Sequence, residues 1–400
     1  MSFTPTRRSV LKAGAATAGV TALSSSALVA QSLRAPSAFA APRGRLVFIF
    51  LRGGQDHLST VVPYTEAAYF DARPTISIPA ESVLDLDGQF GLHPAMTRLH
   101  ALFGAGRLAV IPGVGNLAGN RSHFSAQDLC EAGATSTPPD AKGWLGRYLS
   151  LYPGSNTSIF RATAVSGTTP LSLRGYKSLG VPSIRRFGLN PNVEGISTLL
   201  RDSHFGDLAA EKTGIQALDA AVRIAPRAGS NAADKTTRSL TDLATLLAAN
   251  LGIEVATVDI TGWDTHHDMG TATTGLMRDL LAGLDTYLGA FQADLDARGL
   301  NDVTTVVMTE FGRRVAENGS GGTDHGYGSA MLVMGGRAIG GVHGEWAGLN
   351  ASTIGQRGDV VPTVDFRNVL GDCARGVLGV ASPSSLFPGH TYAPLGVVTP

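Results

Sequence analysis

Three short polar stretches in the second half of the chain carry carboxylates and imidazoles. They occupy residues 262–268, 309–314 and 323–326, and Asp56 lies far upstream of them. The side chains that can act as metal ligands are Asp56, Asp264, His266, His267, Asp268, Glu310, Asp324 and His325. Carboxylate oxygens combined with imidazole nitrogens suit zinc, manganese or iron, whereas soft copper sites use sulfur. The residue types therefore predict a site for divalent metal.

Two metals held by such ligands would favour displacement at phosphorus or sulfur. Metals roughly 4 Å apart can bind both the attacking and the leaving oxygen. Arg313 and Arg314 could then bind the tetrahedral oxyanion bidentately. Each stretch also has an ordinary interpretation: an Asp-x-His turn, an ion pair between Glu310 and Arg313, or a hydrogen-bonded Asp324–His325 pair without metal.

Apolar runs precede the polar stretches and predict the strands that carry them. Residues 45–51, 255–260 and 303–308 are largely apolar, which is typical of strands buried on both faces of a parallel sheet. Between the last two, residues 275–300 repeat apolar side chains at three- and four-residue steps and predict a helix. A helix between two such strands is a crossover that leaves the strands parallel. Their carboxyl ends are therefore expected at one edge of the sheet, where open α/β sheets bind ligands.

A serine–histidine pair precedes another predicted helix, residues 124–132. Ser122 is well placed to cap this helix. Because backbone N–H groups at a helix start stabilise an anion, Ser122 can equally be a nucleophile. His123 can be a base, a metal ligand or a packed side chain. The sequence leaves these alternatives open.

The first forty residues are predicted to be a signal peptide outside the fold. A twin-arginine pattern at Arg7 and Arg8 is followed by a weakly apolar run over residues 13–30 and by a small-x-small sequence ending at Ala40. The run falls short of the ~20 strongly apolar residues that a membrane span needs. We expect export by the twin-arginine machinery to the periplasm or the medium.

The remaining chain, residues 41–400, is predicted to be a single α/β domain with a cap or insertion at about 136–250. A hydrophobic fraction of 43% can build a core, and 16% charged residues argue against disorder. The formal net charge is zero, and no basic patch indicates nucleic-acid binding. No other apolar run could span a bilayer, which argues against an integral membrane protein. Cys130 and Cys373 can form a disulfide or remain buried thiols.

The motifs resemble, in order and spacing, a widespread bacterial family of twin-arginine-exported proteins with domain of unknown function 1501. The resemblance covers residues 43–389 and rests on the segments 52–56, 92–94, 122–124, 262–266, 310–313 and 323–326. That family is in turn similar to the alkaline phosphatase and sulfatase superfamily. The resemblance implies an alkaline-phosphatase-like three-layer α/β/α sandwich with a mostly parallel central sheet.

The resemblance also implies roles for individual residues and one or two ions of zinc, manganese or calcium. The resemblance implies that Asp56, Asp264, His266 and His325 are metal ligands and that Ser122 is the nucleophile. From the residues of the same loops we expect Glu310 and Asp324 as further ligands and His123 and Arg313 as further catalytic residues. Where the superfamily has Asp-His after its penultimate core strand, this chain has Glu310 and Phe311, so one histidine ligand is missing and Asp324 is the candidate substitute. No cysteine occupies the position of Ser122, which argues against a formylglycine sulfatase mechanism.

These observations lead us to expect an exported metal-dependent hydrolase of phosphate or sulfate esters. Its substrate would be an anionic small molecule or a glycan ester, with Ser122 or a water molecule as nucleophile. The departure at Glu310 and Phe311 supports a second hypothesis, a non-catalytic metal- or ligand-binding protein on the same fold. Export alone suggests a third, an accessory protein for surface polysaccharides. The substrate, the metal and the oligomeric state do not follow from the sequence.

Overall fold

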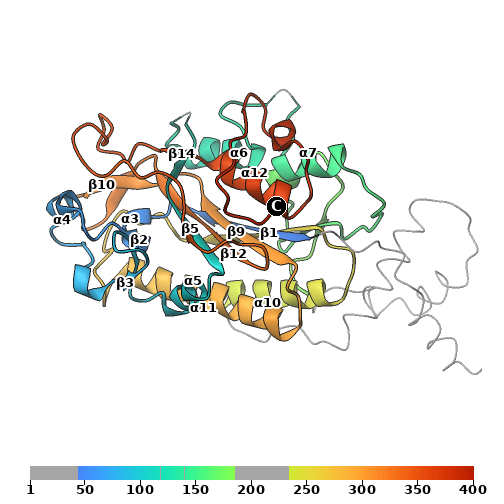
Figure 1. Ribbon diagram of the computed structural model, residues 1–400, viewed down its shortest axis with the longest axis horizontal. Helices are drawn as coiled ribbons and strands as arrows, with labels where there is room; N and C mark the ends of the chain where they lie inside the picture. The colour runs from blue at the N-terminus through green and yellow to red at the C-terminus, as the bar shows by residue number, and fades with distance from the viewer. Residues whose placement is uncertain (1–43, 118, 139, 185–233) are drawn as a thin grey trace, which may run out of the picture. The chain divides into compact units, whose positions relative to one another are not determined.

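A central β-sheet flanked by helices forms the described part of the chain. The computed structural model describes residues 44–117, 119–138, 140–184 and 234–400. Nine strands of this part make the sheet, in the order β13-β5-β12-β9-β1-β8-β6-β7, with β14 paired to β5 (Figure 1). Their bounds are β1 Arg45–Arg52, β5 Leu108–Gly115, β6 Ala162–Ala164, β7 Leu179–Gly180, β8 Val255–Thr261, β9 Val303–Thr309, β12 Ser329–Gly335, β13 Gly341–Val342 and β14 Val364–Asp365.

The sheet is mostly parallel. Every pairing within it is parallel except those of β12, which runs antiparallel to both β5 and β9. Two smaller sheets lie outside it: β2 Val61–Val62, β3 Leu84–Asp85 and β4 Gly91–Leu92 form one, and the hairpin β10 Arg313–Glu317 and β11 Thr323–His325 forms the other.

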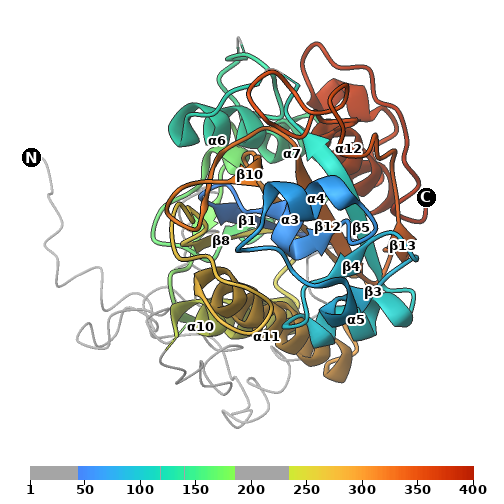
Figure 2. The same cartoon turned by 90° about the vertical axis from the view of Figure 1, so that its left-hand side faces the viewer.

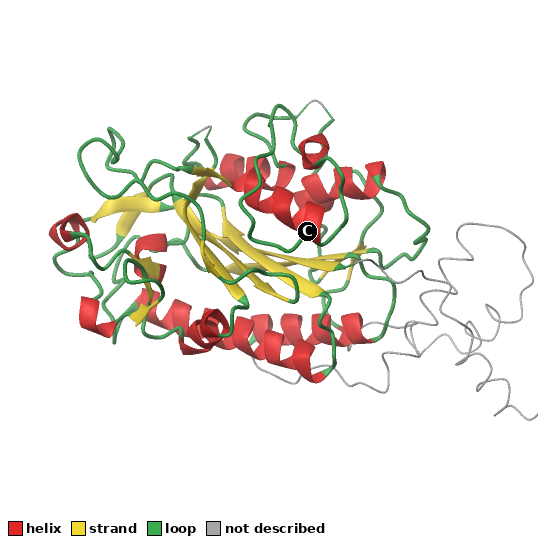
Figure 3. Cartoon of the chain, in the orientation of Figure 1, coloured by secondary structure: helices red, strands yellow, loops and turns green. Residues whose placement is uncertain are grey.

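Helices cover both faces of the central sheet and complete three layers (Figures 2 and 3). On one face lie α5 Thr97–Gly104, α10 Lys235–Ala248 and α11 Leu276–Ala297, and on the other α6 His123–Ala132, α7 Trp144–Leu151 and α12 Phe366–Gly376. Two short helices, α3 His57–Thr60 and α4 Ala67–Ala72, follow β1, and 3-10 turns occupy Ala80–Ser82, Leu171–Leu173 and Pro383–Leu386. The expected three-layer α/β/α fold with a mostly parallel sheet is confirmed. Within the described residues, no helix is long and apolar enough to cross a membrane.

The two layers of core follow from the alternation of side chains along a strand. In β1, Val47, Ile49 and Leu51 belong to the apolar cluster on the α11 side. The intervening residues Leu46, Phe48 and Phe50 belong to the cluster on the opposite side. Each is nearly fully buried, and burial of such a side chain stabilises the fold by about 1.5–3 kcal/mol. Continuous apolarity in this segment thus reflects a strand covered on both faces.

The crossover predicted around residues 275–300 is present. Strands β8 and β9 both run parallel to β1, which lies between them, and α11 connects them. Their carboxyl ends therefore meet at one edge of the sheet. Because β12 is antiparallel, its amino end reaches the same edge. This geometry brings the three polar stretches together.

The central region of the chain contributes to the sheet where the structure describes it. Strands β6 and β7 extend the sheet beyond β8, and α10 packs against α11. Residues 185–233 of the expected cap or insertion lie outside the described residues, as does the expected signal peptide. Cys130 and Cys373, for which sequence left two alternatives, are both buried free thiols.

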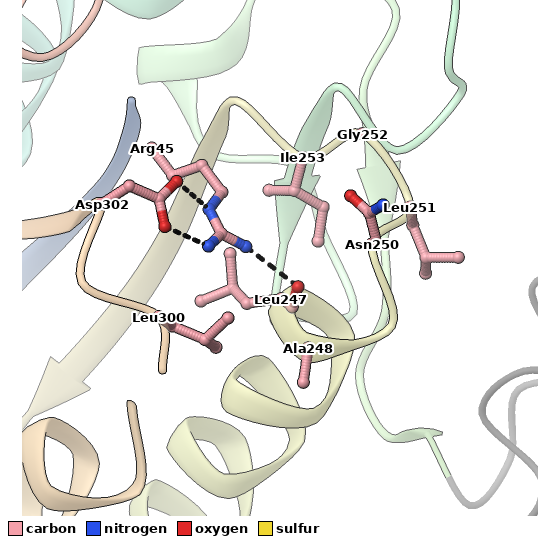
Figure 4. Close-up of a pocket in the computed structure, with 9 residues that line it drawn as sticks. All are labelled: Arg45, Leu247, Ala248, Asn250, Leu251, Gly252, Ile253, Leu300 and Asp302. Atoms are coloured by element: carbon pink, nitrogen blue, oxygen red, sulfur yellow. Dashed lines mark hydrogen bonds and ion pairs between the residues drawn. The ribbon is translucent and has the colours of Figure 1, made fainter. Parts of the chain in front are cut away.

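A cavity of about 180 Å³ lies at the opposite edge of the sheet, where β1, β8 and β9 begin (Figure 4). Arg45 crosses it to Asp302, with 2.7 Å between Nε and Oδ2, and donates to the Leu247 carbonyl at 2.9 Å. Leu247 lies in the last turn of α10, whose carbonyls have no partner within the helix. The polar groups at this cavity therefore stabilise a helix end, and the cavity lies away from the candidate site.

Two buried histidines predict a loss of stability in acid. His57 and His93 are at most 1% exposed, and burial is the largest cause lowering the pKa of each from 6.5 to about 4. For His57, the Asp56 charge raises the pKa and the Arg73 charge lowers it. Between about pH 6.5 and 4 the unfolded chain binds protons that the folded chain does not, so the free energy of unfolding should fall by about 3 kcal/mol for each histidine.

Urea unfolding of chelator-treated protein at about pH 7 and pH 4.5 measures this effect. His57→Gln should lose its share of the pH-dependent decrease, whereas His343→Gln, which changes a half-buried histidine at a distant loop, should retain the full decrease. A free energy of unfolding that is equal at the two pH values would contradict the prediction.

Candidate metal centre

Segments from four parts of the chain meet at the carboxyl edge of the central sheet. Asp264 and His266 follow β8, Glu310 follows β9, His325 ends β11, and His123 begins α6. The loop after β1 passes close to them. Gly53, at φ +127°, permits this approach because a Cβ there would lie 2.5 Å from the Asp264 backbone nitrogen.

Three imidazole nitrogens and one carboxylate oxygen converge at this edge. The Nε2 atom of His325 lies 3.0 Å from Nε2 of His123 and 3.0 Å from Nε2 of His266. Oδ1 of Asp264 lies 3.0 Å from His266 Nε2, 3.2 Å from His325 Nε2 and 3.4 Å from His123 Nε2. We call these four side chains the metal-ligand cluster. One ligand atom each of His123, Asp264 and His325 lies within 4.8 Å of the others, as a shared metal requires.

The outward ring nitrogens determine which atoms face the centre of the cluster. Nδ1 of His325 donates to the Arg121 carbonyl at 2.9 Å, since a carbonyl can only accept. Nδ1 of His123 lies 2.7 Å from Glu310 Oε1 and donates to that carboxylate. A neutral imidazole carries one N–H, so the inward Nε2 of both rings presents a lone pair. These lone pairs face each other and the Asp264 carboxylate, an arrangement of acceptors that a cation would stabilise.

The spacing of these atoms fits a tetrahedral metal. Ligands at the usual zinc distances of about 2.0–2.1 Å lie ~3.3 Å from one another. The three separations that involve Asp264 Oδ1 and the two that join His325 Nε2 to the other rings are 3.0 to 3.4 Å and match that value. The atoms that all lie close enough to share one ion belong to His123, Asp264 and His325, with His266 beside them. Three imidazoles suit zinc or manganese, whereas calcium takes oxygen ligands. The donor set therefore fits a transition-type divalent ion.

The surroundings of Asp264 and His325 favour the protonation states in which these two side chains can bind a metal. Burial raises the pKa of Asp264, but the hydrogen bond and charge of Arg313, with smaller contributions from His325 and His266, hold that pKa at about 2. Burial lowers the pKa of His325, and the Arg313 and His123 charges lower it further, against the hydrogen bonds to Arg121 and Asp264. At neutral pH the carboxylate is charged and His325 is neutral, as metal ligands must be.

Glu310 accepts from Nδ1 of His123, on the side of the ring that faces away from the cluster. Its side chain is fully buried, and besides His123 its Oε1 accepts from the Gly53 N–H at 2.9 Å and from Gln127 Nε2 at 2.9 Å. Its Oε2 accepts from Thr309 Oγ1 at 2.9 Å. A carboxylate behind a histidine ligand fixes the ring and raises its basicity.

Glu310→Gln should therefore lower metal affinity by about 10–100-fold without abolishing binding. The amide cannot accept three N–H groups as a carboxylate does, so the His123 ring loses its fixed orientation. Competition with a chromogenic chelator measures the affinity. Asp268→Asn is the matched control, because Asp268 is exposed and pairs with the neighbouring His267. Wild-type affinity in Glu310→Gln would show that Glu310 has no such role.

Arg313 holds the loops around the cluster together. Its side chain is fully buried, and its nitrogens donate to Asp264 Oδ1 at 2.7 Å and to the Trp263 and Thr323 carbonyls at 3.1 Å each. Its remaining donors reach the carbonyls of Gly53 and Gly54. The oxyanion contact expected for Arg313 therefore competes with hydrogen bonds that already occupy the guanidinium.

Asp56 lies apart from the metal-ligand cluster in a buried ion pair. Arg73 donates to both carboxylate oxygens, at 2.5 and 2.8 Å, and both side chains have no exposed surface. The Asp56 carboxylate also caps α3 by accepting from the Ser59 N–H at 3.1 Å. Nothing in the sequence marks Arg73 as its partner, since it lies in an irregular segment without periodicity.

The remaining predicted residues border the cluster. Oδ1 of Asp324 lies 3.8 Å from His266 Nδ1, and Oδ2 lies 3.3 Å from Arg314. Ser122 is exposed at the N-cap position of α6, but its side chain makes no capping hydrogen bond. The Phe311 ring, which the sequence marked only as a departure, lies 4.8 Å from the rings of both His123 and His325 and packs against them.

Part of the amino-acid sequence matches a family without assigned function. Residues 204–361 match the family described as "Protein of unknown function (DUF1501)". This range includes Asp264, His266, Glu310 and His325, whereas His123 lies outside it. No curated protein matches the sequence significantly.

Three solved structures show a distant similarity. Ps i-CgsB in complex with k-i-k-neocarrahexaose is 11% identical over 86% of this chain and 74% of its own, with a TM-score of 0.39. The lipoteichoic acid synthase LtaP from Listeria monocytogenes is 12% identical over 77% and 69%, with a TM-score of 0.33. Phosphonoacetate hydrolase from Sinorhizobium meliloti 1021, bound to phosphonoformate, is 14% identical over 69% and 58%, with a TM-score of 0.28. At such scores none of them decides the activity of this protein.

Proposed function

We propose that this protein is a metal-dependent hydrolase of phosphate or sulfate esters. The observation that supports this most is the convergence of ligand atoms from His123, Asp264 and His325, with His266 Nε2 3.0 Å from two of them. A divalent ion bound there supplies Lewis acidity toward an ester oxygen. The reaction class rests on the resemblance of the sequence motifs to the alkaline phosphatase and sulfatase superfamily.

The accessibility of the cluster supports a catalytic role over a purely structural one. The Asp264 and His266 side chains are 48% and 41% exposed, so a substrate can reach them. Glu310 and the Arg121 carbonyl fix the His123 and His325 rings from behind. The Ser122 hydroxyl is exposed next to His123, where it is available as a nucleophile in place of water.

Metal analysis together with an activity screen tests the proposal. Purified mature protein should contain one zinc or manganese ion and hydrolyse an aryl phosphate, a phosphodiester or an aryl sulfate. Chelation and Asp264→Asn should both abolish hydrolysis. Metal-loaded wild-type protein with no more activity than Asp264→Asn on all three substrates would refute the proposal.

One observation favours a second function, a non-catalytic metal-binding protein. With His266 next to the other three, the chain offers four possible protein ligands, as structural zinc sites do, whereas catalytic sites keep one position open. If the second function is correct, the metal-loaded protein is inactive, and chelation lowers its unfolding temperature. If the first is correct, Asp264 is the ligand expected to give way, because Arg313 also binds its Oδ1.

We further propose that residues 1–40 direct export through the twin-arginine pathway to the periplasm or medium. The Arg7 and Arg8 pair supports this. Replacing both with lysine should leave the unprocessed protein in the cytoplasm, as cell fractionation would show. Unchanged export of that variant would contradict the proposal.

A further inference from the structure

We propose that a pocket beside the metal-ligand cluster binds a second anionic group of the substrate. The pocket has a volume of about 460 Å³, which lies within the usual ~300–1,000 Å³ range of ligand sites. Its wall includes Leu117, Arg121, Tyr327, Arg357, Asp359 and Val361. The proposal rests on the proposed function, because it assigns part of the same substrate to this pocket.

Arg121 lines the pocket and also contacts a member of the metal-ligand cluster. The Arg121 carbonyl accepts from Nδ1 of His325 at 2.9 Å, so its backbone supports a candidate ligand. Its guanidinium lines the pocket and lies over the Tyr327 ring, 4.2 Å from the ring centroid. Tyr327 follows His325 by two residues. Residues 121 and 325–327 therefore link the cluster to the wall of the pocket.

The charges of the pocket favour an anion. The Arg121 guanidinium pairs with Asp359, whose side chain is 3% exposed. Arg357 is exposed, and within the described part of the chain it forms no ion pair or hydrogen bond. The three ionisable residues Arg121, Asp359 and Arg357 thus leave one positive charge without a partner. Burial lowers the pKa of Arg121, Tyr327 raises it, and the Arg357 and Arg314 charges lower it further.

Apolar side chains next to this charge indicate that the ligand also has an apolar part. Leu117 is 59% exposed and Val361 is 46% exposed, and both line the pocket. Exposed apolar side chains beside a cation suit a group that has a carbon framework and carries a negative charge. We therefore assign to the pocket the leaving group of an ester that bears a carboxylate or a second phosphate or sulfate.

Binding of non-hydrolysable phosphonates tests this assignment independently of catalysis. Calorimetry on the metal-loaded protein would compare phenylphosphonate with its 3- and 4-carboxylated derivatives. Wild-type protein should bind at least one carboxylated derivative about 10-fold more tightly, as one charge-assisted hydrogen bond would provide. Arg357→Gln should remove this preference and leave phenylphosphonate affinity within about 2-fold. Arg107→Gln, an ion-paired arginine at the opposite edge of the sheet, should keep the preference.

The outcomes separate this inference from the proposed function. Equal binding of all three phosphonates by wild-type protein, no binding of any of them, or an equal loss for all three in Arg357→Gln would overturn the inference. A preference that depends on Arg357 in a protein that hydrolyses no ester would leave the anion pocket in place and refute the hydrolase. Hydrolysis of an ester without such a preference would support the hydrolase and refute the anion pocket.

Discussion

His325→Ala and Asp264→Ala should each lose the metal ion that we propose the wild-type protein binds. Both residues contribute an atom to the point where the lone pairs converge, and the two atoms lie 3.2 Å apart. Losing a direct ligand should lower affinity by more than the ~10–100-fold that follows loss of an outer partner. Elemental analysis after dialysis against a weak chelator measures the metal content of each variant.

His267→Ala is the matched control for this experiment. His267 follows a proposed ligand directly in sequence, yet it is exposed and lies 3.0 Å from the Asp268 carboxylate. This variant should keep one metal ion per chain. Metal lost from His267→Ala but retained in His325→Ala would show that the ion binds elsewhere. Far-ultraviolet circular dichroism of each variant confirms that the fold is intact.

The edge of the sheet where the site lies could be predicted from the sequence. Runs of apolar residues at 45–51, 255–260 and 303–308 can be buried on two faces only in a covered parallel sheet. The helix between the last two runs requires them to be parallel, so Asp264 and Glu310 had to lie at the same edge of the sheet. The antiparallel direction of β12, which brings His325 to that edge, has no comparable signal in the sequence.

The role of each side chain at the edge could not be predicted in the same way. A carboxylate after a strand can ligate a metal, accept from a histidine or pair with an arginine, and the sequence around it is similar in all three cases. Glu310 accepts from His123, and Asp56 pairs with Arg73. These differences depend on side-chain direction and on partners far away in the chain. The local pattern at His123 likewise fits a base, a ligand or a packed residue.

The Asp56–Arg73 pair bears on whether the protein binds one metal or two. Both carboxylate oxygens accept from the guanidinium, and neither side chain is exposed. Burial raises the pKa of Asp56, but the charge and hydrogen bond of Arg73 outweigh it and lower that pKa to about 2. Arg73 thus supplies the positive charge that a second metal would otherwise provide. We expect a single metal ion, which Asp56→Asn should retain.

Arg73→Met should lower the free energy of unfolding by about 3–5 kcal/mol, because it leaves the Asp56 carboxylate buried without a counter-charge. Arg73 also donates to the Val315 and Arg314 carbonyls, at 2.8 and 3.0 Å, so β10 loses an anchor as well. Urea unfolding at neutral pH measures the change.

The Asp56→Asn, Arg73→Met double variant distinguishes the lost charge pair from the lost packing. With no buried charge left, it should be more stable than Arg73→Met alone. If the double variant is as unstable as Arg73→Met, the lost free energy of unfolding comes from the contacts of Arg73 with the two carbonyls. If Arg73→Met instead gains a second metal ion, the Asp56 carboxylate can ligate once its partner is removed, and the buried arginine is what limits the wild-type protein to one.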